Sequence, residues 1–386
     1  MSHLTSKSSR LNVKKILPNT VMTVLCIGDP HFKGDNKQET DMMELQVRDL
    51  IVKLDPTFVV VLGDILHTHE KIDLRANKRA TSFLRTLRSV SKHLYVLIGN
   101  HDRPDNNVFL TDDHVFNSLK DWDKTTCVDN VEIKNHIGSD GRTYTFVFAP
   151  YVPPQRLDEA LKTKGLISPY TDISGFFVHQ EFKGAKMNAI TSNEGDIWDA
   201  ESPLCISGHI HDFDYLQDNL IYTGTPIQHT YADRSDKSIS LITYGAPFSD
   251  ILGLESKRSI LRASVIKHER ITLDIPMKIQ LKMSPQDLMT YVMHPRAKIK
   301  IKVVGEATII NDVMKTSHVM ALIAAGVKIT IEDITPAASK MADINEKYLN
   351  VKIKIPFQSR LINAITTITD PGLQNTFYHL FPSMKI

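Results

Sequence analysis

The sequence lacks the features that mark membrane, secreted and disulfide-bonded proteins. Its 386 residues contain no run of about eighteen apolar residues, so no membrane-spanning segment is expected. The first twenty residues carry Lys7, Arg10, Lys14 and Lys15 without an apolar block, and we expect a flexible basic extension rather than a secretory signal. The three cysteines form no C-x-x-C pair, and their odd number argues against a disulfide framework. This cysteine usage indicates a reducing compartment, the cytoplasm or the nucleus.

A strong charge imbalance is also missing. The chain has 46 basic and 44 acidic residues, a net charge of +2, so overall charge gives no support for a nucleic-acid partner. A nucleic-acid partner must therefore be argued from local features. The hydrophobic share of 42% and the charged share of 23% are typical of globular proteins. The length favours one large domain with a smaller one.

The first hundred residues alternate between two hydrophobic patterns. Continuous apolar runs at 21–27, 57–62 and 94–98 predict strands buried on both faces. Apolar residues at helical spacing predict amphipathic helices over about 40–54 and 75–90. The order β-α-β-α-β indicates an α/β fold with a parallel sheet.

Changes in pattern divide the rest of the chain. We expect a core over 21–245, which becomes strand-rich after about residue 140, and a linker rich in Gly, Pro, Ser and mixed charge over 246–270. A small α/β unit is expected over 271–336, with a strand at 298–304, a helix at 311–325 and a strand at 328–332. Residues 337–386 have weak periodicity, with a helix expected near 361–367, and form a candidate docking segment for a partner.

Polar residues of one chemical kind follow five of the predicted strands. Because the carboxyl ends of parallel strands share one edge of a sheet, we expect these residues to meet there. A glycine precedes the polar residues in four of the five segments, as a tight turn would require. The residues, grouped by segment, are Asp29 and His31; Asp64; Asn100, His101 and Asp102; His179; and His209 and His211.

These residue types suit divalent metals. Imidazoles and carboxylates without a thiol favour Mn, Fe or Zn. With His101 and Asp102 set aside and Asp64 bridging, the remaining seven side chains supply four contacts to each of two cations, enough to polarise a phosphate and lower the pKa of a bridging water. Any one aspartate, such as Asp29 or Asp64, could instead cap a helix. Helix capping does not explain the whole set, because ligand-type residues would then have to follow five strands by coincidence.

The five motifs together resemble the calcineurin-like metallophosphoesterase superfamily. In order they are Asp-x-His, Gly-Asp, Gly-Asn-His-Asp, a single His and Gly-His-x-His, within about residues 21–245. The resemblance implies a four-layer α/β/β/α sandwich, here with a small C-terminal α/β cap domain. It also implies the ligand sets of two divalent ions, Mn above all, with Fe, Zn or Mg as alternatives. One set is Asp29, His31, Asp64 and His211, and the other is Asp64, Asn100, His179 and His209.

The same resemblance implies roles for three further residues. His101 would reach the substrate phosphate and protonate the leaving oxygen, and Asp102 would orient it. The segment Gly63-Asp64-Ile-Leu-His67 is similar to the SbcD-type DNA double-strand-break-repair nucleases, in which the extra histidine, here His67, assists catalysis at a phosphodiester. This similarity implies Mn-dependent exonuclease and endonuclease activity on DNA within a recombination-repair complex.

The implied partners include an ATPase. Because the sequence has no G-x-x-x-x-G-K-[ST] loop, a coiled-coil ABC-type ATPase would be a separate chain, and a homodimer is left open. Local basic residues are candidate DNA contacts. Each basic patch could instead be an ordinary solvated face, or an edge strand that lysines protect from aggregation. They are Arg75, Arg79, Lys298, Lys300 and Lys302.

Two other functions remain open from the sequence. A stand-alone phosphoesterase acting on nucleotides or phosphoproteins would turn over monoesters strongly and DNA poorly. A scaffold that has lost the chemistry should show gaps among the ligands, and this sequence shows none.

Overall fold

The computed structural model describes residues 20–69, 71–107, 109–170, 172–187, 190–245, 264–335 and 371–380. The chain divides into two compact units, which are described separately. Unit 1 comprises residues 1–280 and 294–298, and unit 2 comprises 281–293 and 299–386. In the described ranges no helix is long and apolar enough to cross a membrane. The predicted extension before Thr20, most of the predicted linker and the helix near 361–367 lie outside these ranges.

Unit 1 contains two six-stranded sheets. In the first, β1 to β4 run parallel in the order of the chain, β13 pairs with β1 in the antiparallel sense, and β14 pairs with β13 in the same way. Its order is β14 (Ser264–Ile271), β13 (Ile239–Gly245), β1 (Thr20–Ile27), β2 (Phe58–Val61), β3 (Leu94–Leu97) and β4 (Thr125–Val128). The strands predicted at 21–27, 57–62 and 94–98 are therefore confirmed.

The second sheet is built from the strand-rich half of unit 1. Its central strands β6, β7, β10 and β12 are parallel, with antiparallel strands at both edges. Its order is β11 (Asp214–Gln217), β12 (Leu220–Tyr222), β10 (Cys205–Ser207), β7 (Gly175–Val178), β6 (Thr143–Ala149) and β5 (Glu132–Ile137). A short hairpin, β8 (Lys186–Met187) and β9 (Ile190–Thr191), forms a separate pair.

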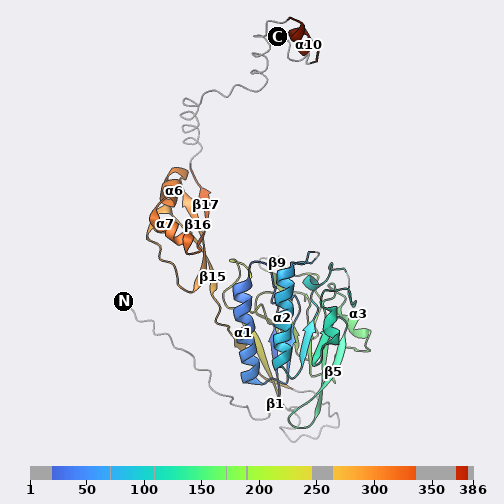
Figure 1. Ribbon diagram of the computed structural model, residues 1–386. Coiled ribbons are helices and arrows are strands. Elements are labelled where there is room, and N and C mark those ends of the chain that lie inside the picture. Colours follow the sequence, from blue (N-terminus) through green and yellow to red (C-terminus); the bar gives the residue numbers. More distant parts are fainter. Residues whose placement is uncertain are drawn as a thin grey trace, which may run out of the picture. The chain divides into compact units, whose positions relative to one another are not determined.

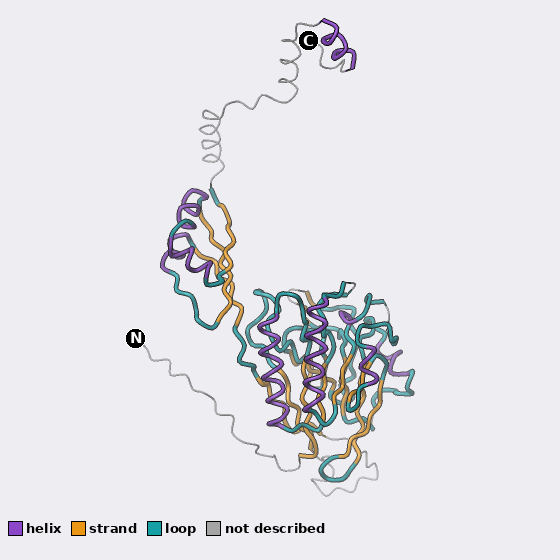
Figure 2. Tube along the Cα trace, viewed as in Figure 1, coloured by secondary structure: helices purple, strands orange, loops and turns teal. Residues whose placement is uncertain are grey.

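Alternating side chains along each strand build the layers of unit 1. In β1, Leu25 and Ile27 pack against the helices α1 (Lys37–Leu54) and α2 (Leu74–Val90), whereas Val24 and Cys26 pack between the two sheets. The helices lie side by side over the first sheet (Figures 1 and 2). The outer face of the second sheet is covered by α3 (Leu157–Lys162) and by loops. The predicted α/β sandwich is thus confirmed, with a fourth layer made largely of loops.

The boundary of unit 1 differs from the predicted one. Residues 264–270, assigned to the linker from composition, form most of β14 and pair with β13 along its length. The segment that follows also belongs to the core, since Leu273 is buried in the cluster beneath α1 and α2. Mixed charge misled the prediction because an edge strand alternates polar and apolar residues.

Unit 2 is a small α/β unit. Its sheet has the order β15 (Met277–Met283), β16 (Ala297–Gly305) and β17 (Lys328–Asp333), and its helices are α5 (Pro285–Thr290), α6 (Ala307–Met314) and α7 (Ser317–Ala324). The single helix predicted over 311–325 is instead two, because Thr316 is extended and its side chain caps α7 by accepting a hydrogen bond from the Val319 N–H. A further helix, α10 (Pro371–Leu380), lies in the predicted tail.

Candidate metal centre

Five loops of unit 1 bring the predicted ligands together. Three follow β1, β2 and β3 of the first sheet, and two follow β7 and β10 of the second. The apolar pattern alone predicted one parallel sheet edge, whereas the five loops follow strands of two sheets, as expected for the four-layer sandwich that the family resemblance implied. The pattern could not separate the sheets, because strands buried on both faces look alike whichever sheet they join.

The loops after β1 and β2 are joined by backbone hydrogen bonds. The His31 N–H donates to the Asp64 carbonyl at 3.0 Å, and the Phe32 N–H donates to the Ile65 carbonyl at 2.7 Å. Asp29, His31 and Asp64 have φ values of 25°, 44° and 48°, which non-glycine residues seldom adopt. Such strain, held in place by its surroundings, is typical of functional sites.

One group of ligand atoms gathers around Asp29. One ligand atom each from Asp29, His31 and Asp64 lies within 4.8 Å of the others. The Nε2 atoms of His31 and His211 are 3.0 Å apart, and His31 Nε2 is 3.7 Å from Asp64 Oδ2. These are the members of the first predicted ligand set.

A second group gathers on the other side of Asp64. One ligand atom each from Asp64, His179 and His209 lies within 4.8 Å of the others. Asn100 Oδ1 is 3.1 Å from both His179 Nε2 and His209 Nδ1. Since Asp64 belongs to both groups, the structure places it where a bridging carboxylate would stand.

Backbone carbonyls orient two of the imidazoles. His31 Nδ1 donates to the Leu66 carbonyl at 3.1 Å, and His179 Nδ1 donates to the Leu62 carbonyl at 2.7 Å. Because a carbonyl only accepts, each Nδ1 carries a proton, and Nε2 is the ring nitrogen that approaches the carboxylate of Asp64. Metal-binding histidines in proteins are commonly fixed in this way.

The electrostatics of the cluster fit cations. Asp29 is fully buried, and its Oδ2 has no hydrogen-bond partner among the residues that the structure describes. Burial raises the pKa of Asp29, and the carboxylate of Asp64 adds to the rise. Burial also opposes ionisation of Asp64, but the imidazoles of His179 and His31 outweigh it and hold its pKa well below the usual value. A divalent cation would satisfy a buried carboxylate oxygen that has no hydrogen-bond partner and lies among imidazole nitrogens.

A glycine provides the space for Asp64. A Cβ added at Gly99 would lie 2.2 Å from Asp64 Oδ1 and 2.3 Å from its backbone nitrogen. We therefore expect Gly99→Ala to displace Asp64 and weaken metal binding at least about tenfold. The measurement is isothermal titration with Mn²⁺. Gly165→Ala is the control, because Gly165 has a φ of 71° but open space around it, and it should lower stability without changing metal affinity.

His101 lies at the accessible side of the cluster. Its side chain is 27% exposed, and its Nε2 is 3.9 Å from Asp64 Oδ2. Its Nδ1 donates to the His67 carbonyl at 2.8 Å. The rings of His67 and His101 are nearly parallel, with centroids 6.0 Å apart. The backbone carbonyl of His67 thus fixes the His101 ring, and the side chain of His67 lies beside that ring.

Asp102 differs from its expected role. Its buried carboxylate accepts backbone N–H groups from Gly99 at 3.0 Å, Leu66 at 2.9 Å and Ile65 at 3.2 Å. It therefore ties together the loops that carry Asp64 and Asn100, while the His67 carbonyl, not Asp102, fixes the His101 ring. Motif spacing could not reveal this, because the partners of Asp102 are backbone groups.

His229 is a further residue of the site that was not predicted from the sequence. This buried imidazole donates from Nε2 to the Asp29 carbonyl at 3.0 Å, and its ring meets those of His31 and His211 edge to face. It supports the first ligand group without belonging to it. Residue type alone gave no signal for this role, because the carbonyl that His229 binds lies 200 residues away in the sequence.

The predicted DNA contacts are not equivalent. Lys298 pairs with the buried Glu39 at 2.8 Å, and Lys302 pairs with Glu332 at 2.6 Å. Lys300 alternates with buried isoleucines, as the pattern predicted. Arg75 is exposed. Arg79 is not free, since its guanidinium donates to Thr40 Oγ1 at 2.7 Å and to the Lys33 carbonyl. DNA contact by any of these residues remains a prediction.

Arg79 and Arg75 offer a matched test on one helix. Arg79→Ala removes charged hydrogen bonds that hold the Lys33 loop to α1, and we expect it to cost about 2 kcal/mol of unfolding free energy. Arg75→Ala should leave stability unchanged, because its side chain is 86% exposed. Urea denaturation measures both. Equal stability of the two variants would contradict the structural role of Arg79.

Comparisons with known proteins identify the family of this chain. Residues 22–213 match the family description Calcineurin-like phosphoesterase. "Putative phosphoesterase 244L" of Invertebrate iridescent virus 6 is 35% identical over 74% of this chain and 94% of its own length. "Putative phosphoesterase 078R" of Invertebrate iridescent virus 3 is 33% identical over 81% and 84%. The solved structure titled "GAP50 the anchor in the inner membrane complex of Plasmodium" has a TM-score of 0.37 at 14% identity, over 66% of this chain and 89% of that one. The chain belongs to the calcineurin-like phosphoesterase family, whose members hydrolyse phosphoesters with divalent metal ions.

Proposed function

We propose that this protein is a two-metal phosphodiesterase that cleaves DNA. The observation that carries the proposal is the pair of parallel imidazoles, His67 and His101, at the accessible side of a seven-residue ligand cluster. A phosphomonoester needs one proton donor for its leaving group. A second imidazole is useful where the phosphate carries an additional ester that must be positioned.

The ligand residues would hold the cations in two sets. Asp64 would bridge, with Asp29, His31 and His211 on one side and Asn100, His179 and His209 on the other. Two divalent ions, Mn²⁺ in our proposal, supply positive charge for the phosphate oxygens and lower the pKa of an attacking water.

His101 and His67 would act on the substrate directly. In hydrolysis a water oxygen bonds to phosphorus, the bond from phosphorus to the leaving oxygen breaks, and that oxygen takes a proton. The Nδ1 hydrogen bond of His101 to the His67 carbonyl aims Nε2 at the space beside Asp64, where it can deliver this proton. Asp102 would act indirectly, because its carboxylate fixes the loops that carry Asp64 and Asn100.

The proposal includes partners. A coiled-coil ABC-type ATPase on another chain would direct the nuclease to DNA ends, with the C-terminal tail as its docking segment. The alternative is a stand-alone phosphoesterase for nucleotides or phosphoproteins, which the same cluster would also support.

Metal-dependent cleavage of end-labelled DNA tests the proposal. The full chain is assayed with Mn²⁺, Mg²⁺ or Zn²⁺, beside a chromogenic phosphomonoester and with a chelator control. We expect Mn²⁺-dependent DNA cleavage. His67→Ala should lower diester cleavage at least about tenfold more than monoester turnover. Monoester turnover without DNA cleavage would favour the alternative, and equal losses on both substrates would remove the role proposed for His67.

A further inference from the structure

A cavity of about 390 Å³ opens beside His67. Its walls come from the loops after β1 and β2 and from the start of α2, so they continue directly from the segments that hold His31 and Asp64. The two walls meet at Gly34, where an added Cβ would lie 2.6 Å from the carboxylate of Asp73, the N-cap of α2. The volume falls in the range of small-molecule sites, about 300–1,000 Å³. We call it the His67 cavity.

The lining of the His67 cavity combines apolar surface with cations. Leu66 and Ile72 supply aliphatic surface, and Ile72 is 47% exposed. Lys33 and Lys71 supply positive charge. Lys33 already donates to the His229 carbonyl, whereas the ammonium of Lys71 makes no ion pair with any residue that the structure describes. The buried Nδ1 of His67 has no hydrogen-bond partner in the described part of the chain.

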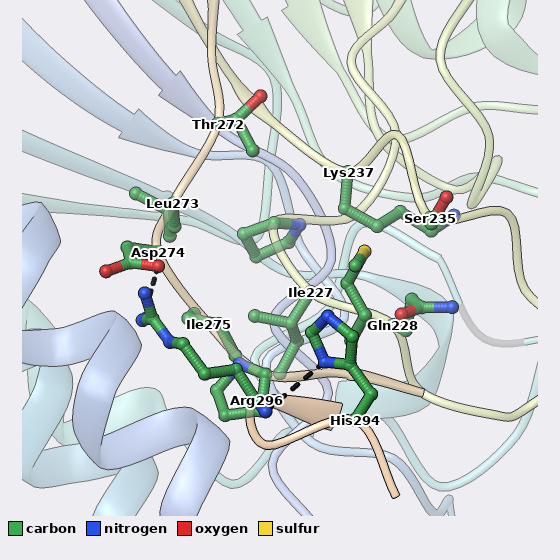
Figure 3. A pocket seen from close by; sticks show the side chains of 13 residues that line it. Ile227, Gln228, Ser235, Lys237, Thr272, Leu273, Asp274, Ile275, His294 and Arg296 are labelled. Carbon is green, nitrogen blue, oxygen red and sulfur yellow. Dashed lines mark hydrogen bonds and ion pairs between the residues drawn. The ribbon is translucent and has the colours of Figure 1, made fainter. Parts of the chain in front are cut away.

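A second cavity of unit 1 shows the contrast. It measures about 320 Å³ and is drawn in Figure 3. Its cations are occupied: Arg296 pairs with Asp274 at 2.6 Å, and Lys237 donates to the His211 carbonyl at 2.7 Å and to Asp212 at 2.9 Å. It therefore offers a ligand little beyond apolar surface, whereas the His67 cavity offers unsatisfied polar groups next to the ligand cluster.

We propose that the His67 cavity binds the nucleoside on one side of the scissile phosphate. This inference rests on the proposed function and deepens it by naming the substrate class, a phosphodiester with a nucleoside at that position. The aliphatic wall suits a base or sugar face, and Lys71 suits the next phosphate. The cavity adjoins His67, which lies parallel to His101, so an occupant would stand next to the reacting group.

Ile72 and Lys71 test the assignment because neither touches the ligand cluster. Each is changed in the full chain, as Ile72→Ala and Lys71→Gln. The controls are Leu74→Ala, an apolar side chain 79% exposed on the same segment, and Lys78→Gln, an exposed lysine further along α2. Neither control residue lines the cavity. Two diesters are compared: a dinucleotide and methyl p-nitrophenyl phosphate, which has no nucleoside.

We expect kcat/KM for the dinucleotide to fall about tenfold in Ile72→Ala and in Lys71→Gln, chiefly through KM, with no change for the methyl ester or in the controls. Fluorescence anisotropy of a labelled dinucleotide in EDTA should show the same loss of binding, independently of metal. Equal losses on both diesters, or no loss on either, would overturn the nucleoside site. Failure of the unchanged protein to hydrolyse any phosphoester with any metal would instead overturn the proposed function. In that case the binding measured in EDTA would still show whether the His67 cavity takes a nucleoside.

Discussion

Replacing His101 with glutamine is expected to lower kcat by about 100- to 10,000-fold while both metal ions stay bound. General acid catalysis contributes a factor of this size. His101, in the Gly-Asn-His-Asp segment, belongs to neither ligand group. Its Nε2 lies at the exposed side of Asp64. Because Nδ1 is bound to the His67 carbonyl, the ring cannot turn to become a ligand without losing that bond.

Steady-state kinetics and metal analysis of the same preparation separate the two roles. His318→Gln is a suitable control, since this histidine bonds to the Tyr291 carbonyl within unit 2. A substrate with a better leaving group should be hydrolysed with a smaller loss, because it needs less help from an acid. If His101→Gln lost metal in proportion to activity, His101 would be a ligand or a support for one, and the proposed role would be wrong.

Replacing Asp64 with alanine is expected to remove both ions at once. Asp64 is the only residue common to both ligand groups, and both of its oxygens approach imidazoles, Oδ1 at 3.3 Å from His179 Nε2 and Oδ2 at 3.7 Å from His31 Nε2. Removing it takes a contact and the shared negative charge from both cations, so that Asp29 is the one carboxylate left in the first group and the second group keeps only neutral donors. Metal content should fall from two ions per chain to less than one, and hydrolysis should fall by at least about 1,000-fold.

Substitutions on one side of the cluster give the comparison. His211→Ala touches only the first group and Asn100→Ala only the second, so each should weaken one ion and leave the other bound. Asp113→Ala, at an exposed carboxylate away from the cluster, should keep both. If the Asp64→Ala protein retained one tightly bound ion, the two metal sites would not share this carboxylate.

The sequence predicted the ligands better than the architecture around them. Each ligand type was visible because a polar residue directly after a buried apolar run is conspicuous. The division into two sheets came from the family resemblance and was not visible in the apolar pattern, since β3 and β7 present the same continuous apolar run although they lie in different sheets. The apolar pattern of a strand indicates that the strand is buried, but it does not indicate which strand lies next to it.

Supporting contacts were the hardest to foresee. Arg79 looked like a surface cation on a basic helix, yet it binds a hydroxyl and a carbonyl 39 and 46 residues away. His229 supports Asp29 across 200 residues, and Asp102 supports three backbone N–H groups. Such contacts depend on tertiary geometry, and residue type alone gives no signal for them. The break between α6 and α7 was more accessible, because Thr316 is a favourable N-cap residue.

A crystal structure of the protein grown with Mn²⁺, with anomalous diffraction recorded at the manganese edge, tests the central claim most directly. The account predicts two anomalous peaks about 3.5–4 Å apart. Asp64 should contact both, with Asp29, His31 and His211 at one peak and Asn100, His179 and His209 at the other. A single peak, or peaks away from these seven side chains, would contradict it.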